Sequence, residues 1–241
     1  MLHKTRGIVL KVTDYSESSV VVKIFTEKFG VQSYLINGVK KPKAKVKMNM
    51  LQALHLLDMV VYHKPMATMH KVSDVRSSPI LSSIPYDISK SAIAMFLNEV
   101  IYKSIKEQVD DALLFEFIST SIELLDQEDG SVANFHLVFL MKLTRFLGFH
   151  PDLSFADTSS YFDLKEGAFV SSEPPHAFFI KEFFLEKFIE IIRTPIQDYK
   201  NVKLDNLTRK YLLDSLIDYF SLHVDNFGVI KSQDVLEDVL G

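Results

Sequence analysis

The sequence predicts an α+β protein of two modules: a five-stranded β-barrel in residues 1–80 and a mainly α-helical module in residues 81–241. Three observations predict this organisation. Strand-like segments separated by turns fill roughly the first 75 residues, whereas apolar residues recur at helical spacing after about residue 89. The charge also changes sign, because residues 1–80 carry 13 Lys and Arg against 5 Asp and Glu (+8), and residues 81–241 carry 14 against 26 (−12).

The predicted strands occupy residues 5–12, 19–26, 31–39, 54–62 and 68–75. The second of them has β-branched residues on both faces, which is typical of a strand in a closed or covered sheet. A hairpin turn is expected at residues 27–30, and Asn37 with Gly38 suits a bulge or tight turn. Five strands in this length fit a small barrel, either of the oligonucleotide-binding (OB) type or of the SH3-like type.

Five lysines and no acid occupy residues 39–47, directly after the third predicted strand. Pro42 within this run argues against a regular helix or a central strand, so the charges are expected on a loop or a mobile strand end. Such a loop offers repeated ammonium groups to a polyanion. The alternative is a solvated, disordered turn that binds nothing.

The predicted boundary is the segment 77–85, which contains two prolines and four serines. Helices are expected at residues 89–106, from a cap at Asp110 and Asp111, at 131–147 with a stop at Gly148, at 177–193, at 206–226, and from Ser232. Their apolar stripes are expected to form the core. Between 149 and 176 the pattern weakens into an insert, whose hairpin turns at Glu166 and Gly167.

The composition argues against several classes of protein. The absence of cysteine excludes disulfides, thiolate zinc sites and a cysteine nucleophile. The sequence contains no phosphate-binding loop, dinucleotide fingerprint or nucleophile elbow, and the eight histidines are dispersed. His150 and His176 bracket the insert, but two histidines without an acid pattern make a weak metal site. We therefore predict neither an enzyme nor a metal or other cofactor.

The N-terminal residues lead directly into an alternating segment, without an apolar signal core, and no apolar run approaches membrane-spanning length. The expectation is a soluble cytoplasmic protein without a membrane partner.

Nucleic-acid binding has better support, because basic residues recur throughout the predicted barrel. The candidate contacts to DNA are Arg6, Lys11, Lys23, Tyr34, Lys40, Lys41, Lys43, Lys45, Lys47, Lys71 and Arg76. Tyr15, Tyr34 and Tyr62 could stack on bases, although aromatic residues more often pack in a barrel core or rim. Since no base-reading helix is evident, sequence-tolerant binding, preferably to single strands, is expected. The alternative is a protein-interaction adaptor with no direct DNA contact.

Several motifs follow one another along the chain. They are RGIVL (6–10), YSESS (15–19), IFTEKFG (24–30), NGVKKPK (37–43), LGFHPDL (147–153) and RKYLL (209–213), with Lys231 and Ser232. In this order they resemble the RecO family of bacterial DNA repair proteins. The resemblance implies an OB-fold barrel followed by a helical domain. It also implies a cytoplasmic, nucleoid-associated recombination mediator that binds single- and double-stranded DNA, anneals complementary strands, cooperates with RecR and helps load RecA onto strands coated by single-strand-binding protein.

Two further expectations follow from the resemblance. Many relatives carry four zinc-binding cysteines in the insert, whereas residues 155–170 here contain none, so the hairpin is expected to hold by packing of Tyr161, Phe162 and Phe169. The family also binds the acidic, phenylalanine-ended tail of the single-strand-binding protein through its helical domain. Lys142 and Arg145 are the candidate contacts to that tail, and an ordinary surface role is the alternative.

Overall fold

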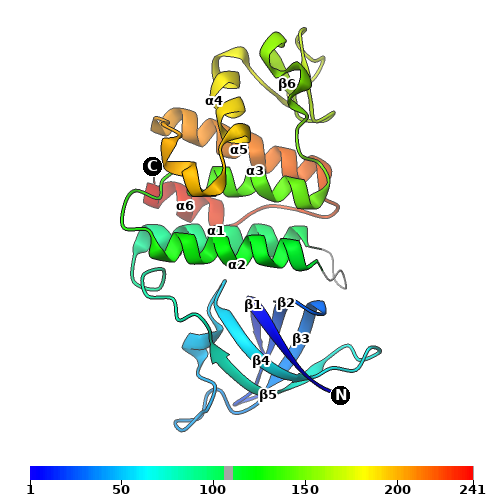
Figure 1. The fold of residues 1–241 in the computed structure, drawn as a ribbon, viewed down its shortest axis with the longest axis vertical. Coiled ribbons are helices and arrows are strands. Elements are labelled where there is room, and N and C mark those ends of the chain that lie inside the picture. The colour runs from blue at the N-terminus through cyan, green and yellow to red at the C-terminus, as the bar shows by residue number, and fades with distance from the viewer. Residues whose placement is uncertain (106–110, 241) are drawn as a thin grey trace. The chain divides into compact units, whose positions relative to one another are not determined.

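The computed structural model describes residues 1–105 and 111–240 (Figure 1). The chain divides into two compact units, Met1–Gln127 and Glu128–Gly241. The first unit contains a β-barrel and two helices, and the second contains further helices and a small sheet, so the predicted α+β class is confirmed. The change from strands to helices falls near residue 80, inside the first compact unit.

Five strands close into a barrel in the order β1-β2-β3-β5-β4, and β4 pairs back with β1. Their bounds are β1 (Leu2–Asp14), β2 (Val20–Thr26), β3 (Gly30–Ile36), β4 (Leu56–Tyr62) and β5 (His70–Ser77). Neighbouring strands run antiparallel except β3 and β5, which are parallel. This Greek-key arrangement is that of the OB fold, which decides between the two predicted barrel types.

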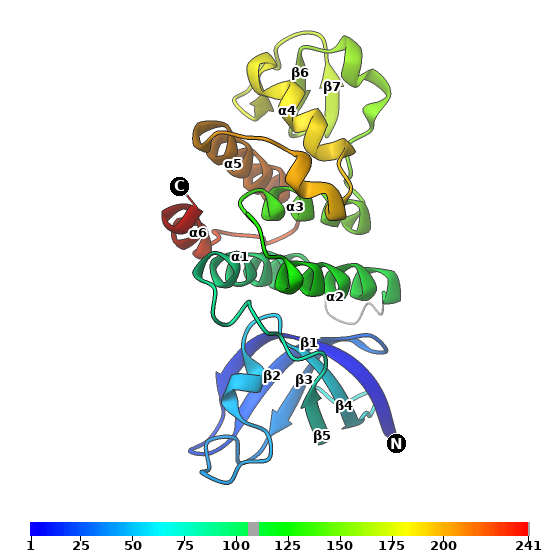
Figure 2. The ribbon, with the colours of Figure 1, turned by 60° about the vertical axis from the view of Figure 1, so that its left-hand side comes forward.

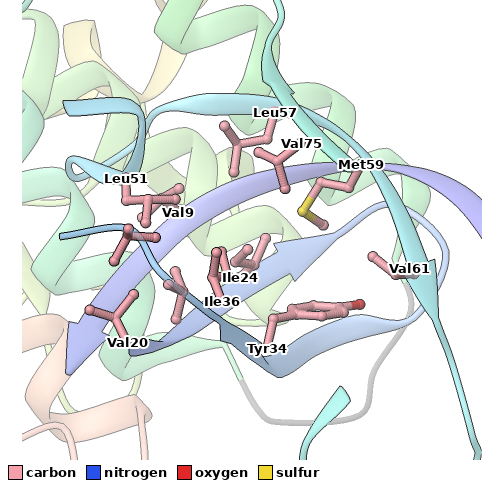
Figure 3. Close-up of a cluster of buried hydrophobic side chains, with 12 residues drawn as sticks. Val9, Val20, Ile24, Tyr34, Ile36, Leu51, Leu57, Met59, Val61 and Val75 are labelled. Atoms are coloured by element: carbon pink, nitrogen blue, oxygen red, sulfur yellow. The ribbon is translucent and has the colours of Figure 1, made fainter. Parts of the chain in front are cut away.

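The barrel core consists of the inward-facing side chains of the five strands (Figure 3). Its members include Val9, Val20, Val22, Ile24, Tyr34, Ile36, Leu57, Met59, Val61 and Val75. Gly7 permits a close approach of β1 to its neighbours, because a Cβ atom there would lie 2.6 Å from Ile24 Cγ2 and 2.8 Å from Met59 Cε. A larger residue at this position would require the side chains of Ile24 and Met59 to shift.

The predicted turn between the second and third strands is present and is fixed by Thr26. Its hydroxyl donates to the carbonyl of Gly30 at 2.8 Å and accepts from the amide of Phe29 at 3.1 Å. Gly30 has a φ of +63°, a conformation that favours glycine. The hairpin therefore depends on local chemistry that the sequence already displays.

Two helices complete the first unit, α1 (Ile88–Ser104) and α2 (Ala112–Gln127), which run side by side over the barrel (Figures 1 and 2). Asn98 of α1 donates to the carbonyl of Leu10 at 2.8 Å, and the ring of Phe115 of α2 lies 5.6 Å from that of Phe25. The amide of Leu114 donates to Asp111 at 2.9 Å, which confirms this half of the predicted cap. Asp110 and Lys106 lie outside the described residues.

The segment before α1 is tied to the end of α2 by Asp126. Its carboxylate accepts hydrogen bonds from the amides of Ser82, Ser83 and Ile84, each at 2.8 Å. Burial acts to raise the pKa of Asp126, but these bonds outweigh it and lower that pKa. One buried carboxylate thus satisfies three main-chain donors of the connecting segment.

The second unit is mainly helical, as predicted. Its helices are α3 (Phe135–Leu147), α4 (Glu182–Arg193), α5 (Asn206–His223) and α6 (Ser232–Leu240), with 3₁₀ turns η2 (Leu153–Thr158) and η3 (Ile196–Asn201). Gly148 ends α3 in the left-handed conformation with a φ of +87°, which confirms the predicted stop. Among the helices of the described residues, none combines the length and apolarity that a membrane crossing requires.

The insert forms a three-stranded sheet in the order β7-β6-β8, from β6 (Tyr161–Asp163), β7 (Ala168–Val170) and β8 (Phe179–Ile180). The prediction that a helix begins at residue 177 is wrong, because Phe179 and Ile180 pair with β6 and α4 begins only at Glu182.

Packing and one turn hold this sheet. The ring of Phe162 is fully buried and lies 4.9 Å from that of Phe169 and 4.8 Å from that of Phe188. Asp163 accepts from the amides of Lys165 and Glu166, which builds the predicted turn before Gly167. The insert is thus stabilised by apolar contacts, as the sequence predicts.

Candidate nucleic-acid interface

The lysine segment, residues 39–47, is anchored to the barrel at both ends. Val39 is 4% exposed within the barrel core, and Val46 packs against the same cluster. Between them, the amide of Lys41 donates to Gly38 and the amide of Ala44 donates to Lys41, which makes successive turns; the 3₁₀ turn η1 (Met48–Leu51) follows. Two apolar anchors therefore give the lysines a defined place on the barrel surface.

The lysines of this segment fall into two groups. Lys40 pairs with Asp14 at 2.7 Å, and Lys45 pairs with Asp74 at 2.7 Å. Lys41, Lys43 and Lys47 are exposed and form no ion pair with any residue that the structure describes. The positive charges of these three ammonium groups are therefore not balanced by an acidic partner among those residues, unlike those of Lys40 and Lys45.

Lys11 and Lys23 lie opposite each other on β1 and β2, next to helix α1. Their ammonium groups lie 5.2 Å and 5.6 Å from the centre of the Tyr102 ring. A cation over the face of an aromatic ring is attracted by the ring's negative π-surface. Tyr102 therefore holds the two cations together, on the part of the barrel that the helices border.

Arg6 is engaged in ion pairs, unlike the exposed lysines. Its guanidinium donates to Glu27 at 2.9 Å and to Glu116 of α2 at 2.7 Å, and it lies 5.0 Å from the centre of the Phe115 ring. The hydrogen bonding that Arg6 donates to Glu27 is the main cause that raises the pKa of Arg6, and the same bonding lowers the pKa of Glu27. Arg6 thus connects β1 to α2, and a phosphate would have to compete with two carboxylates for it.

Lys71 and Arg76 lie on β5, and both are exposed. Arg76 is opposite Asp58 in the register with β4, beside a shallow cavity of about 440 Å³ that Lys4 and Lys28 also line. Lys4 and Lys28 were not among the predicted contacts. Lys4 could have been found, because it stands two residues before Arg6 in a strand and therefore faces the same side.

Tyr34 is the predicted contact that the structure argues against. Its side chain is 0% exposed and lies among Ile36 and Val61 inside the barrel, so neither face of the ring is open to a base (Figure 3). Burial also raises the pKa of its hydroxyl. Tyr15 and Tyr62, in contrast, are 59% and 49% exposed.

In the second unit, the two candidate partner contacts have different environments. Lys142 donates to the carbonyl of Ile192, near the end of α4, at 2.6 Å. Burial, together with the charge of Arg145, lowers the pKa of Lys142 to about 8. Arg145 is exposed and lies 3.5 Å from a ring nitrogen of His150, so it is the more accessible cation.

An apolar cavity of about 440 Å³ lies between α5 and α6 in the same unit. Leu207, Leu213 and Leu236 line it, and Lys210 and Arg209 also contribute. Arg209 donates to Asn134 and Asn206, which fixes its guanidinium. The predicted contacts Lys142 and Arg145 are not among the residues that line this cavity.

Nothing in the described part of the chain brings three or more His, Asp or Glu side chains into a group suited to a metal ion. His150 contacts the hydroxyl of Thr144 at 2.9 Å, and His176 contacts Asp163 at 3.2 Å. The two histidines that bracket the insert are therefore each held by a separate partner.

Comparisons with known proteins agree with this architecture. The family model described as "Recombination protein O N terminal" matches residues 1–78, and the model described as "Recombination protein O C terminal" matches residues 85–232. Relatives named DNA repair protein RecO from Bacteroides fragilis and Phocaeicola vulgatus are 35% identical over 240 residues and 34% identical over 239 residues, with 99% of both chains covered. One from Flavobacterium johnsoniae is 34% identical over 238 residues, with 98% of both chains covered. The chain therefore belongs to the RecO family of DNA repair proteins.

Proposed function

We propose that this protein is a recombination mediator that binds single- and double-stranded DNA, anneals complementary strands and helps load RecA onto DNA coated by single-strand-binding protein. The observation that carries the proposal is the group of exposed, unpaired lysines Lys41, Lys43 and Lys47, which the buried Val39 and the partly buried Val46 hold on an OB-fold barrel. Family membership supports it. The protein acts by holding and presenting strands, with RecR as a cooperating partner and without bond chemistry of its own.

The first test is a salt titration of binding to a fluorescent single-stranded oligonucleotide, followed by anisotropy. The Lys41→Ala/Lys43→Ala variant is expected to bind about 10- to 30-fold more weakly at 0.1 M salt, and its salt slope should fall by about 1.4, because two phosphate contacts are lost. The matched control is Lys181→Ala/Lys203→Ala, which removes two exposed lysines from the second unit. Failure of the native protein to bind at low salt would favour the adaptor alternative. Equal affinities of the two double variants would show that the lysine segment does not contact the DNA.

Strand annealing is a separate prediction. A protein that holds two strands on a basic surface reduces the repulsion between their phosphates, so it should speed pairing without ATP. The measurement mixes complementary oligonucleotides that carry a fluorophore and a quencher, with and without the protein. We expect faster quenching with the native protein and little acceleration with Lys41→Ala/Lys43→Ala. An unchanged rate with the native protein would contradict the annealing activity.

The helical unit is proposed to bind the acidic, phenylalanine-ended tail of the single-strand-binding protein, with Arg145 as a contact. Arg145→Glu should weaken binding of a synthetic tail peptide about tenfold or more, because an attractive charge pair becomes repulsive. Lys203→Glu is the control, since it makes the same change of charge at another exposed position of this unit. Calorimetry with both variants checks the prediction, and equal losses would indicate only a general effect of charge.

A further inference from the structure

Tyr15 stands at the tip of the β1–β2 hairpin with 59% of its surface exposed. The backbone around it is fixed, because the amides of Tyr15 and Ser16 both donate to the carbonyl of Ser19, at 3.1 Å and 3.2 Å. Buried side chains already fill the barrel interior, so the ring of Tyr15 stays at the surface. The ring is thus displayed on a stable support.

The same turn is joined by three contacts to Lys40 of the lysine segment and to Asn37, which lies just before the segment. The amide of Lys40 donates to the carbonyl of Ser18 at 3.4 Å, and the ammonium group of Lys40 pairs with Asp14 at 2.7 Å. The hydroxyl of Ser19 donates to the side chain of Asn37 at 3.1 Å. Figure 2 shows the hairpin and the segment after β3 at the same end of the barrel. Tyr15 is therefore held beside the segment that presents Lys41 and Lys43.

This combination suits one class of ligand. An unpaired base exposes both faces to stacking, and its phosphate lies one sugar away, so an aromatic ring beside ammonium groups can hold both parts of a nucleotide. In a duplex the base faces are stacked on their neighbours and closed to a side chain. A ring in this place therefore favours single strands over duplexes, a preference that lysines alone do not give.

The other tyrosines of this unit are placed differently. Tyr34 is buried in the barrel core, and Tyr102 of α1 already has Lys11 and Lys23 over its ring. Tyr62 is 49% exposed at the end of β4, where it stands opposite Lys71 of β5. Tyr86 is 86% exposed before α1, with Asp87 beside it. Of these side chains, Tyr15 is the one joined to the lysine-rich segment by hydrogen bonds of its own turn.

We propose that Tyr15 stacks on an unpaired base of single-stranded DNA while the neighbouring lysines hold the flanking phosphates. This inference rests on the proposed function, since it names the residue through which the barrel distinguishes single strands from duplexes.

The first experiment compares variants for binding to an oligothymidine and to a duplex of the same length. Tyr15→Ala should lose about 5- to 150-fold in affinity for the single strand, keep its duplex affinity within about twofold, and keep its salt slope, because no phosphate contact is removed. Tyr15→Phe should bind like the native protein. Tyr86→Ala is the control for removing an exposed tyrosine.

The second experiment uses the absence of tryptophan from the chain. Tyr15→Trp provides a single indole at the proposed stacking position, and its fluorescence should be quenched when oligothymidine is added, whereas Tyr86→Trp should change little. Stacking is overturned if Tyr15→Ala binds single strands like the native protein, or if Tyr15→Trp is not quenched by a strand that binds. Both results are distinct from failure of the proposed function, in which the native protein itself binds no DNA.

Discussion

Tyr34→Ala is expected to lower the free energy of unfolding by about 3–5 kcal/mol, as replacement of other fully buried aromatic residues does. The side chain is 0% exposed, and its removal leaves a cavity lined by Ile36 and Val61 in a barrel wall that cannot easily collapse. Urea denaturation followed by far-ultraviolet circular dichroism measures the loss.

The conservative variant Tyr34→Phe separates packing from any role in binding. The buried hydroxyl of Tyr34 has no hydrogen-bond partner among the described residues, so its removal should leave the stability equal or slightly higher. Single-strand affinity should also remain unchanged, because the ring does not reach the surface. Weakened binding by Tyr34→Phe at unchanged stability would contradict the core position of this residue.

The stability of the second unit is expected to fall in acid because of His136. The side chain is 1% exposed, and burial, together with the charge of Arg209, lowers the pKa of His136 to about 3. In the unfolded chain the imidazole titrates near 6.5, so between about pH 6.5 and pH 3 the unfolded chain binds the proton and the folded chain does not. The contribution of His136 to the free energy of unfolding is therefore complete above pH 6.5 and is lost as the pH falls. At pH 4 the loss is about 3 kcal/mol.

The measurement is urea denaturation at pH 7 and pH 4.5 for the native protein and for His136→Leu. The variant should lose less stability between the two pH values, because it has no imidazole to protonate at this position. His223→Gln is the control; it replaces a histidine that contacts the carbonyl of Leu164 and should retain most of the native pH dependence. An identical pH dependence in His136→Leu and the native protein would show that the buried imidazole is not the cause.

Much of the barrel could be predicted from the sequence because its strands carry local signals. β-Branched residues on both faces identify β2, and Gly30 identifies the following turn. The parallel pairing of β3 with β5 could not be predicted, since it depends on which strand edges remain after the hairpins form. The start of α4 was also mistaken, because Phe179 and Ile180 suit a helix or a strand equally and only their pairing with β6 decides between them.

The candidate interface was predictable where it depends on composition and not where it depends on contacts between distant residues. Five lysines around a proline indicate a surface segment without further information. The inward direction of Tyr34 was ambiguous, because Val31 and Leu35 make the opposite face of β3 apolar as well. Nothing local to Arg6 reveals Glu116, which is 110 residues away, and nothing local to Lys11 reveals Tyr102.

The bonds that Asp126 accepts have a consequence for how this sequence can diverge. At positions 82–84 its partners are three main-chain amides, which every residue except proline supplies, together with the hydroxyls of Ser82 and Ser83. Replacing one of these serines removes a hydroxyl donor but keeps the three amides, so it should be tolerated better than a change at position 126, provided that proline is avoided. Position 126 has no such freedom, because a carboxylate has the acceptor capacity for three amides and a charge that their dipoles stabilise. Among homologues, the acid at this position is thus expected to vary less than the residues that face it. In an alignment that pattern would suggest catalysis, whereas here hydrogen bonding within the fold explains it.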